Sequence, residues 1–383
     1  MLPFVGYPGP GPGVYPEDVL RAGMRRVMFR DVLDSNDADA YIREAMRWHF
    51  DPETGSPFWL AQAASLGFDP RADVRSVDDL RMFPNVVDQL RDIRVEQLIP
   101  RGYGDSAEIV GVYDSGGTTG APKRVVFLND WLQRMITHML EPLDRLGIPL
   151  GLNWLGILPT GPHAVGHFIG LVARARRGLM YTVDMDPRWV RKLIASGQQA
   201  QADAYVEHLV EQSSHVLLSQ EVGVLMTTPP MLERLARRED LLAAITRSVR
   251  LIMWGGAHMD ADTHDLFRNE VFPGIPLHGV YGSTMIMGGA NQRLGDTEFP
   301  VFDGFGPHIT FRVVDPATME PVPYGTRGQV VTNHVSKSML LPNNLERDTA
   351  IRVAAPSGQP GDSLADLAPV QVFGDEAVIE GVY

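Results

Sequence analysis

The residues best suited to chemistry lie in one loop, residues 113–124 (YDSGGTTGAPKR), which has an apolar stretch on each side. Because glycine has no side chain, the backbone N–H groups of such a loop can converge on an anion, and neighbouring hydroxyl groups add hydrogen-bond donors. A lysine near the end of the loop adds a positive charge. The loop is therefore predicted to bind phosphate. The residues expected to do so are Ser115, Gly116, Gly117, Thr118, Thr119, Gly120 and Lys123.

Two other interpretations of this loop are weaker. A Walker loop would need glycine where Ala121 stands, and it would lead into a helix, whereas residues 124–128 (RVVFL) predict a strand. This difference argues against a kinase-like or GTPase-like site. An ordinary glycine-rich hairpin would also suit G-G-T-T-G alone. The serine before it and the Pro-Lys pair after it favour phosphate binding.

Composition and charge argue against several classes of function. The chain of 383 residues has 34 basic and 47 acidic side chains, and its net charge of −13 argues against nucleic acid or an anionic membrane as partner. It has no cysteine, which excludes disulfides, thiolate-bound zinc and a cysteine nucleophile. The N-terminus does not resemble a secretory signal, and no apolar run approaches the roughly 18 residues of a membrane span. We expect a cytoplasmic protein.

The elements that must position the loop follow an α/β order. Residues 16–94 have the helical spacing of apolar side chains, and from residue 109 short apolar strands alternate with amphipathic helices. Residues 309–333 instead predict antiparallel strands. The expected organisation is a flexible arm at 1–15, a helical layer with an α/β core at 16–305, and a smaller antiparallel β subdomain at 306–383.

The loop SGGTTGAPK (residues 115–123) resembles the S-(G/S)-G-T-T-G-x-P-K signature of the adenylate-forming superfamily, which includes acyl-CoA synthetases, luciferase-like enzymes and peptide-synthetase adenylation domains. Further segments resemble the other motifs of these enzymes in the same order. They are PTGPHAVG (159–166), MWGGAHM (253–259), HGVYGST (278–284), GQVVTN (328–333), LERDTAIRV (345–353) and VFGDEAVIEGV (372–382). Residues 56–86 and 335–348 are most similar to the phenylacetate-CoA ligases. The resemblance implies the large N-terminal domain of the adenylate-forming fold.

For activity, the resemblance implies that a carboxylate attacks the α-phosphorus of ATP, that pyrophosphate leaves, and that an acyl-AMP forms. It implies ATP, Mg²⁺ and CoA as cofactors, with CoA as acyl acceptor and a small aryl or arylacetic acid as substrate. Acyl transfer to an amine, a hydroxyl group or a protein, as in acyl-protein synthetases, stays open. A non-catalytic relative that only binds nucleotide stays open as well. A homodimer is compatible with the resemblance.

The resemblance also implies roles for individual residues. Lys123 would hold the β- and γ-phosphates, Thr284 would reach the α-phosphate, and His163 would contact the carboxylate or gate its pocket. The residues implied in nucleotide binding beyond the loop are Gly255, Gly256, Ala257, Tyr281, Gly282, Ser283 and Asp348. Among these, Tyr281 would stack on adenine and Asp348 would bind ribose. The residues implied in the acid pocket are Trp154, His163, His167, Met285 and Met287.

An ordinary structural role is the alternative interpretation for several of these residues. Thr284 can be a turn residue, Tyr281 a core side chain, and Trp154 part of the hydrophobic core. His163 and His167 are four residues apart, so on a helix they would also permit a metal site, although the sequence offers no third ligand.

The sequence departs from the family at several positions. The glutamate that holds Mg²⁺ in Y-G-x-T-E is Met285 here, and a thioether is a poor ligand for this hard cation. The candidates to replace it are Asp296, Glu298 and Thr119. A late-strand glutamate is Gln329, and Asp348 lies in an unusual N-L-E-R-D segment. The chain ends where the family has a hinge, without the C-terminal lid domain and its lysine. We expect either a truncated protein, which the abrupt end favours, or a natural protein that works without the lid.

Overall fold

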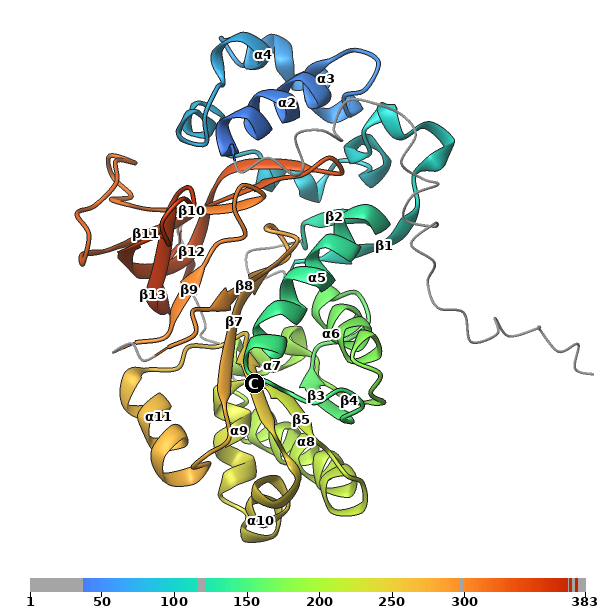
Figure 1. Cartoon of the computed structure of the whole chain (residues 1–383), viewed down its shortest axis with the longest axis vertical. Helices are drawn as coiled ribbons and strands as arrows, with labels where there is room; N and C mark the ends of the chain where they lie inside the picture. Colours follow the sequence, from blue (N-terminus) through green and yellow to red (C-terminus); the bar gives the residue numbers. More distant parts are fainter. Residues whose placement is uncertain (1–36, 116–120, 296–298, 371, 374–375, 378–383) are drawn as a thin grey trace, which may run out of the picture.

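The structure is a computed structural model that describes residues 37–115, 121–295, 299–370, 372–373 and 376–377 (Figure 1). Several predicted features lie outside these residues. They are the arm at 1–15, the loop residues Gly116, Gly117, Thr118, Thr119 and Gly120, and the metal candidates Asp296 and Glu298. The hinge expected at 372–382 is described only through the short strands β14 (Val372–Phe373) and β15 (Glu376–Ala377).

A layer of short helices precedes the sheet and lies over its antiparallel end (Figure 1). Its helices are α2 (Ala38–Phe50), α3 (Pro57–Gln62) and α4 (Pro70–Asp73). The layer is anchored by Trp59, whose Nε1 donates to Leu340 O at 2.9 Å, and by Tyr41, whose hydroxyl donates to Val335 O at 3.1 Å. Both donors are buried, so these bonds fix how the layer meets the sheet. The predicted helical layer is confirmed over the described residues, and its predicted part at 16–36 lies outside them.

The segments on either side of the phosphate loop form a separate hairpin. Strand β1 (Ile109–Asp114) pairs antiparallel with β2 (Arg124–Leu128), and its register places Asp114 opposite Arg124. The side chains of β2 are buried from Val125 onward, which ties the hairpin to the core. The two predicted strands are confirmed, and their paired ends hold the loop between them.

One sheet of eleven strands forms the body of the described chain, in the order β10-β11-β12-β13-β9-β8-β7-β6-β5-β3-β4. Its parallel strands are β3 (Trp154–Leu158), β4 (Met180–Asp184), β5 (Val224–Thr227), β6 (Leu251–Gly255) and β7 (Leu277–Ser283). Strands β3, β5 and β6 are buried along their whole length, as expected for parallel strands covered on both faces.

Helices pack around these parallel strands (Figure 1). They are α5 (Asn129–Arg145), α6 (Ala164–Ala175), α7 (Pro187–Ala195), α8 (Gln199–Ser219), α9 (Pro229–Ala236), α10 (Glu239–Ser248) and α11 (Ala261–Leu266). In the described part of the chain, none of the helices combines the length and the apolar character that crossing a bilayer requires.

Antiparallel strands continue the same sheet. They are β8 (Gly288–Gln292), β9 (Val301–Asp303), β10 (Ile309–Val314), β11 (Arg327–Val335), β12 (Leu340–Ala354) and β13 (Asp362–Pro369). Strand β8 pairs with β7, β9 with β8, and β13 with β9, so hydrogen bonding is continuous from the parallel to the antiparallel end. The predicted α/β fold with an antiparallel β region is confirmed. The domain boundary between 305 and 306 stays a prediction.

Candidate active site

A cavity of about 470 Å³ opens at the carboxyl ends of the parallel strands, the edge of an α/β sheet where ligands bind. The last residues of β3, β5, β6 and β7 reach it. The start of α6, the ends of the β1–β2 hairpin, and parts of β12 and β13 complete its wall. The fold therefore brings together the separate segments that the sequence predicted to form one site.

The described ends of the phosphate loop face each other across the hairpin. Ser115 N donates to Lys123 O at 2.8 Å, and Lys123 N donates to the Ser115 hydroxyl at 3.0 Å. Both residues line the cavity. The Lys123 ammonium forms an ion pair with Asp88 Oδ1 at 3.2 Å, and the charges of Lys123 and Arg91 oppose the effect of burial to hold the pKa of Asp88 below its usual value.

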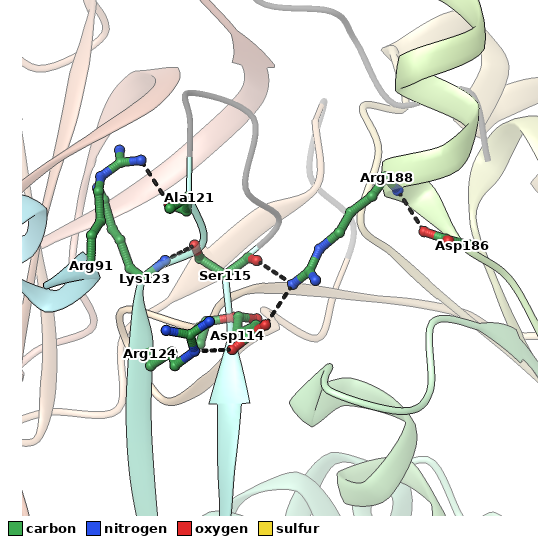
Figure 2. A network of polar contacts seen from close by, with 9 residues as sticks. Arg91, Asp114, Ser115, Ala121, Lys123, Arg124, Asp186 and Arg188 are labelled. Atoms are coloured by element: carbon green, nitrogen blue, oxygen red, sulfur yellow. Dashed lines mark hydrogen bonds and ion pairs between the residues drawn. The ribbon is translucent and has the colours of Figure 1, made fainter. Parts of the chain in front are cut away.

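The carboxylate of Asp114 ties the base of this loop to two arginines (Figure 2). Arg188 Nη2 lies 3.1 Å from Asp114 Oδ2, and Arg124 Nε lies 3.3 Å from Oδ1. The same Arg188 nitrogen also donates to Ser115 O at 3.0 Å. The main-chain carbonyl of Asp114 accepts from the Thr284 hydroxyl at 3.2 Å. Strand β1, helix α7 and the turn after β7 thus meet at one residue.

Tyr281 and Asp348 form the other end of the site. The Tyr281 hydroxyl donates to Asp348 Oδ2 at 2.9 Å, and both residues line the cavity. Burial raises the pKa of Asp348, whereas the hydrogen bond from Tyr281 and the charge of Arg347 lower it. Burial and the Asp348 charge raise the pKa of Tyr281 well above its ordinary value. This geometry places an aromatic ring and a carboxylate side by side in the cavity wall.

Two glycines at the end of β6, Gly255 and Gly256, occupy positions where a larger residue would not fit or would be strained. A Cβ on Gly255 would lie 2.5 Å from Val280 O, and Gly256 has a φ of +78°, which favours glycine. Ala257 and Gly282 line the same wall without bulk. The missing side chain of Gly255 thus makes room for the neighbouring strand β7, and Gly256 permits the positive φ that ends β6.

Glu346 is a cavity residue that the sequence interpretation did not single out. Its Oε1 accepts hydrogen bonds from Asn344 Nδ2 at 2.7 Å, Ser283 Oγ at 3.1 Å and Thr332 Oγ1 at 3.3 Å. Burial and then the Asp348 charge raise the pKa of Glu346 to about 7, against the opposing effects of Ser283 and of nearby positive charges. An acidic residue in the middle of a strand that predicts a buried β-structure was the available signal in the sequence.

An apolar pocket forms the remaining part of the cavity. Met285 and Met287 line it from the turn after β7, and their side chains are 5% and 0% exposed. Val165 and Phe168 contribute from α6. His163, which precedes α6, also lines the cavity, and burial followed by the charge of Arg188 lowers its pKa. A neutral imidazole thus lies beside an apolar pocket.

Trp154 and His167 are not among the residues that line the cavity, so their role in an acid pocket stays an untested prediction. Trp154 begins β3 and is buried in the hydrophobic core, whereas the cavity lies at the opposite, carboxyl end of that strand. His167 is exposed, and its ring lies 6.0 Å from that of Tyr113. Trp154 lies at the end of β3 that is away from the cavity, and His167 lies on the exposed side of α6.

The sequence has Met285 where the family has its Mg²⁺-binding glutamate, but the structure places another carboxylate, that of Glu346, in the cavity wall. Among the described residues, no three histidine, aspartate or glutamate side chains are grouped to hold a metal ion, which leaves the His163–His167 alternative without support. Mg²⁺ bound with a nucleotide needs only one or two protein carboxylates, because phosphates and waters complete its coordination. Glu346 supplies a carboxylate in the cavity wall and fits this requirement.

Comparison with known proteins finds one matching family profile and several structures of similar fold. The profile of a family described as AMP-binding enzyme matches residues 204–337. The chain is similar to solved structures of 2-hydroxyisobutyryl-CoA ligase. The structure with 2-HIB-AMP and CoA in the thioesterification state gives 15% identity and a TM-score of 0.59, over 87% of this chain and 67% of that one. An open conformation with 2-HIB-AMP and CoA gives 16% identity and a TM-score of 0.56, over 86% of this chain and 73% of that one.

No protein of curated function matches the sequence. The family profile matches about a third of the chain, residues 204–337, and the solved structures share its fold. Membership of the adenylate-forming superfamily stays a prediction. The resemblance to its phenylacetate-CoA ligases stays a prediction.

Proposed function

We propose that this chain activates a small carboxylic acid as its acyl-AMP, with ATP as the second substrate and pyrophosphate as the leaving group. The observation that carries the proposal is that Lys123, Thr284 and Asp348 share one cavity with an apolar pocket beside His163. A nucleotide with its ribose at Asp348 and its β- and γ-phosphates at Lys123 would bring its α-phosphate to Thr284. The acid in the pocket would then approach that phosphorus.

The proposed reaction depends on positioning and on stabilisation of negative charge. Lys123 would exchange its ion pair with Asp88 for one with the β- and γ-phosphates. The Thr284 hydroxyl would donate to an α-phosphate oxygen instead of to the Asp114 carbonyl. A neutral His163 would donate a hydrogen bond to the substrate carboxylate without adding charge. Bound Mg²⁺ would neutralise part of the phosphate charge.

The acid is proposed to be an aryl or arylacetic acid, because flat apolar groups suit a pocket lined by Phe168, Met285 and Met287. CoA is the proposed acyl acceptor. Amine, hydroxyl and protein acceptors are the alternatives that the products of the second half-reaction would identify.

The test is ATP–pyrophosphate exchange against a panel of aryl, arylacetic and fatty acids. We expect exchange that depends on an aryl or arylacetic acid, and Lys123→Ala should reduce it at least 100-fold. Lys192→Ala is the matched control, because Lys192 is an exposed lysine on α7 outside the cavity, and its exchange rate should stay within twofold of the unchanged protein. Exchange absent for every acid would contradict enzymatic activation and favour a relative that only binds nucleotide.

A further inference from the structure

The two oxygens of the Glu346 carboxylate have different surroundings. Three donors, on Ser283, Thr332 and Asn344, all bond to Oε1. Within the described part of the chain, no hydrogen bond or ion pair is made by Oε2, although the residue lines the cavity. The donors come from β7, β11 and β12, so three strands fix the orientation of one carboxylate. Such a carboxylate is prepared to offer its second oxygen to a ligand.

The position of Glu346 restricts what that ligand can be. It lies two residues before Asp348 on β12, and its partner Ser283 is the neighbour of Thr284. Lys123 is close enough for its charge to act on the Glu346 carboxyl group. Glu346 therefore stands between the proposed phosphate end and the proposed ribose end of the site.

A bare carboxylate in this position would repel the phosphates of ATP. Two like charges at contact distance in a partly buried site cost several times more than they would in bulk water. The repulsion disappears if a cation lies between the carboxylate and the phosphates, or if the carboxyl group carries a proton. Because Oε1 already accepts from three donors, the lone pairs of Oε2 are the ones left to bind a cation or a proton.

We propose that Glu346 ligates the divalent cation of bound ATP through Oε2. It would thus supply, from β12, a carboxylate near the turn where Met285 offers only a thioether. Ser283, Thr332 and Asn344 act as positioning residues that hold Oε1. This inference rests on the proposed function, since it requires that the cavity binds ATP.

The test compares ATP affinity with excess Mg²⁺ and with EDTA, measured by isothermal titration calorimetry on the full chain. In the unchanged protein we expect Mg²⁺ to tighten ATP binding at least tenfold. Glu346→Gln keeps the shape of the side chain and removes its charge, so it should reduce this gain to less than threefold. Affinity without Mg²⁺ should stay the same or improve, because a source of repulsion is lost. Glu346→Asp keeps a carboxylate and should retain part of the gain.

The matched control is Glu320→Gln, which removes one negative charge from an exposed position between β10 and β11. It should keep the full effect of Mg²⁺. As a second readout, the electron paramagnetic resonance signal of Mn²⁺ bound with a non-hydrolysable ATP analogue should weaken for Glu346→Gln at equal protein concentration. Thermal unfolding of each variant shows that it is folded.

Two results would overturn the proposal in different ways. If Glu346→Gln binds ATP and keeps the same gain from Mg²⁺, Glu346 does not ligate the cation, while the proposed function stands. The same holds if ATP binds the unchanged protein equally well without Mg²⁺, which would indicate a protonated Glu346 that donates directly to phosphate. If the unchanged protein binds no ATP in either buffer, the proposed function fails, and this inference fails with it.

Discussion

At the scale of single residues, Lys123 already has a partner that a nucleotide must displace. Its ammonium group lies 3.2 Å from Asp88, whose side chain is 78% exposed. An exposed ion pair of this kind is worth about 0.2 to 1 kcal/mol, because water and salt screen it. The pair therefore opposes phosphate binding only slightly, and it holds the lysine near the loop in the free protein.

Removing the Asp88 charge should consequently strengthen nucleotide binding. We expect Asp88→Asn to lower the Kd for ATP by about 1.4- to fivefold, the factor that corresponds to such an ion pair. Calorimetry at low and at high salt measures this, and the gain should shrink as salt rises. Asp92→Asn, a nearby exposed aspartate, is the control and should change the Kd less. Weaker binding by Asp88→Asn would show that Asp88 positions Lys123 for phosphate instead.

At the scale of elements, helix α7 holds the phosphate hairpin in place. Asp186 caps the helix by accepting from the backbone N–H groups of Arg188 and Trp189, and Pro187 occupies its first turn. Capping fixes where the helix begins, and so it directs Arg188 toward Asp114 and Ser115 (Figure 2). Arg188 thus connects α7 to Asp114 and Ser115 at the base of the phosphate loop, which lie 74 and 73 residues earlier in the chain.

A double-mutant cycle tests this connection. Arg188→Ala should weaken ATP binding roughly tenfold, because the base of the loop loses its support, and Asp114→Asn should have a similar effect. The double variant should be no more than about threefold worse than either single variant, a coupling on the order of 1 kcal/mol. Arg237→Ala, on an exposed arginine at the end of α9, is the control. Additive losses would mean that the two residues act independently.

At the scale of the whole molecule, buried histidines link the layers of the fold. His334 Nδ1 lies 2.9 Å from Ile286 O, His308 Nδ1 lies 2.9 Å from the Tyr41 hydroxyl, and His49 Nε2 lies 2.7 Å from Ser336 O. Burial is the largest cause of the lowered pKa of each, to about 3 for His308 and His334 and to about 4 for His49. Burial likewise lowers the pKa of His138 and His278 to about 4.

These pKa values predict acid sensitivity with a definite sign. The unfolded chain takes up protons as pH falls through about 6.5, whereas the folded chain stays neutral at these positions until about pH 4. Stability from each histidine is thus complete above pH 6.5 and declines below it, by about 2 kcal/mol for each at pH 5. We expect the midpoint of urea unfolding to fall steeply between pH 6.5 and 5. His278→Gln should flatten this dependence, and the exposed His215→Gln should not. A flat profile for the unchanged protein would contradict the account.

Much of the fold was predictable from local sequence patterns. The elements that were not predicted were missed for physical reasons. The apolar run at 124–128 predicted β2 because a buried strand leaves a clear signal. Helix α8 was not assigned, since its apolar and polar residues are weakly segregated over Gln199–Ser219. Helix α7 was missed although Asp186-Pro187 is a start signal. The continuity of the sheet through β13 and β9 depends on distant pairing that no local pattern records.

The site was predictable where a motif named its residues. Ser115, Lys123, Thr284 and Asp348 were expected from the sequence and line one cavity. Their chemical roles remain predictions. Glu346 and Arg188 were not expected, because their importance arises from contacts with Ser283 and Asp114 across the fold. Sequence resemblance locates the loop, and tertiary structure supplies the residues that hold it.

The most direct test of the central claim follows the oxygen of the acid. An aryl acid labelled with ¹⁸O in its carboxylate is incubated with the protein, ATP and Mg²⁺, and the products are examined by mass spectrometry. Attack of the carboxylate on the α-phosphorus predicts an acyl-AMP with the label in its bridging oxygen, and AMP that carries one ¹⁸O after the acyl group is released. Label in inorganic phosphate with formation of ADP, or no transfer of label to AMP with any acid, would contradict the account.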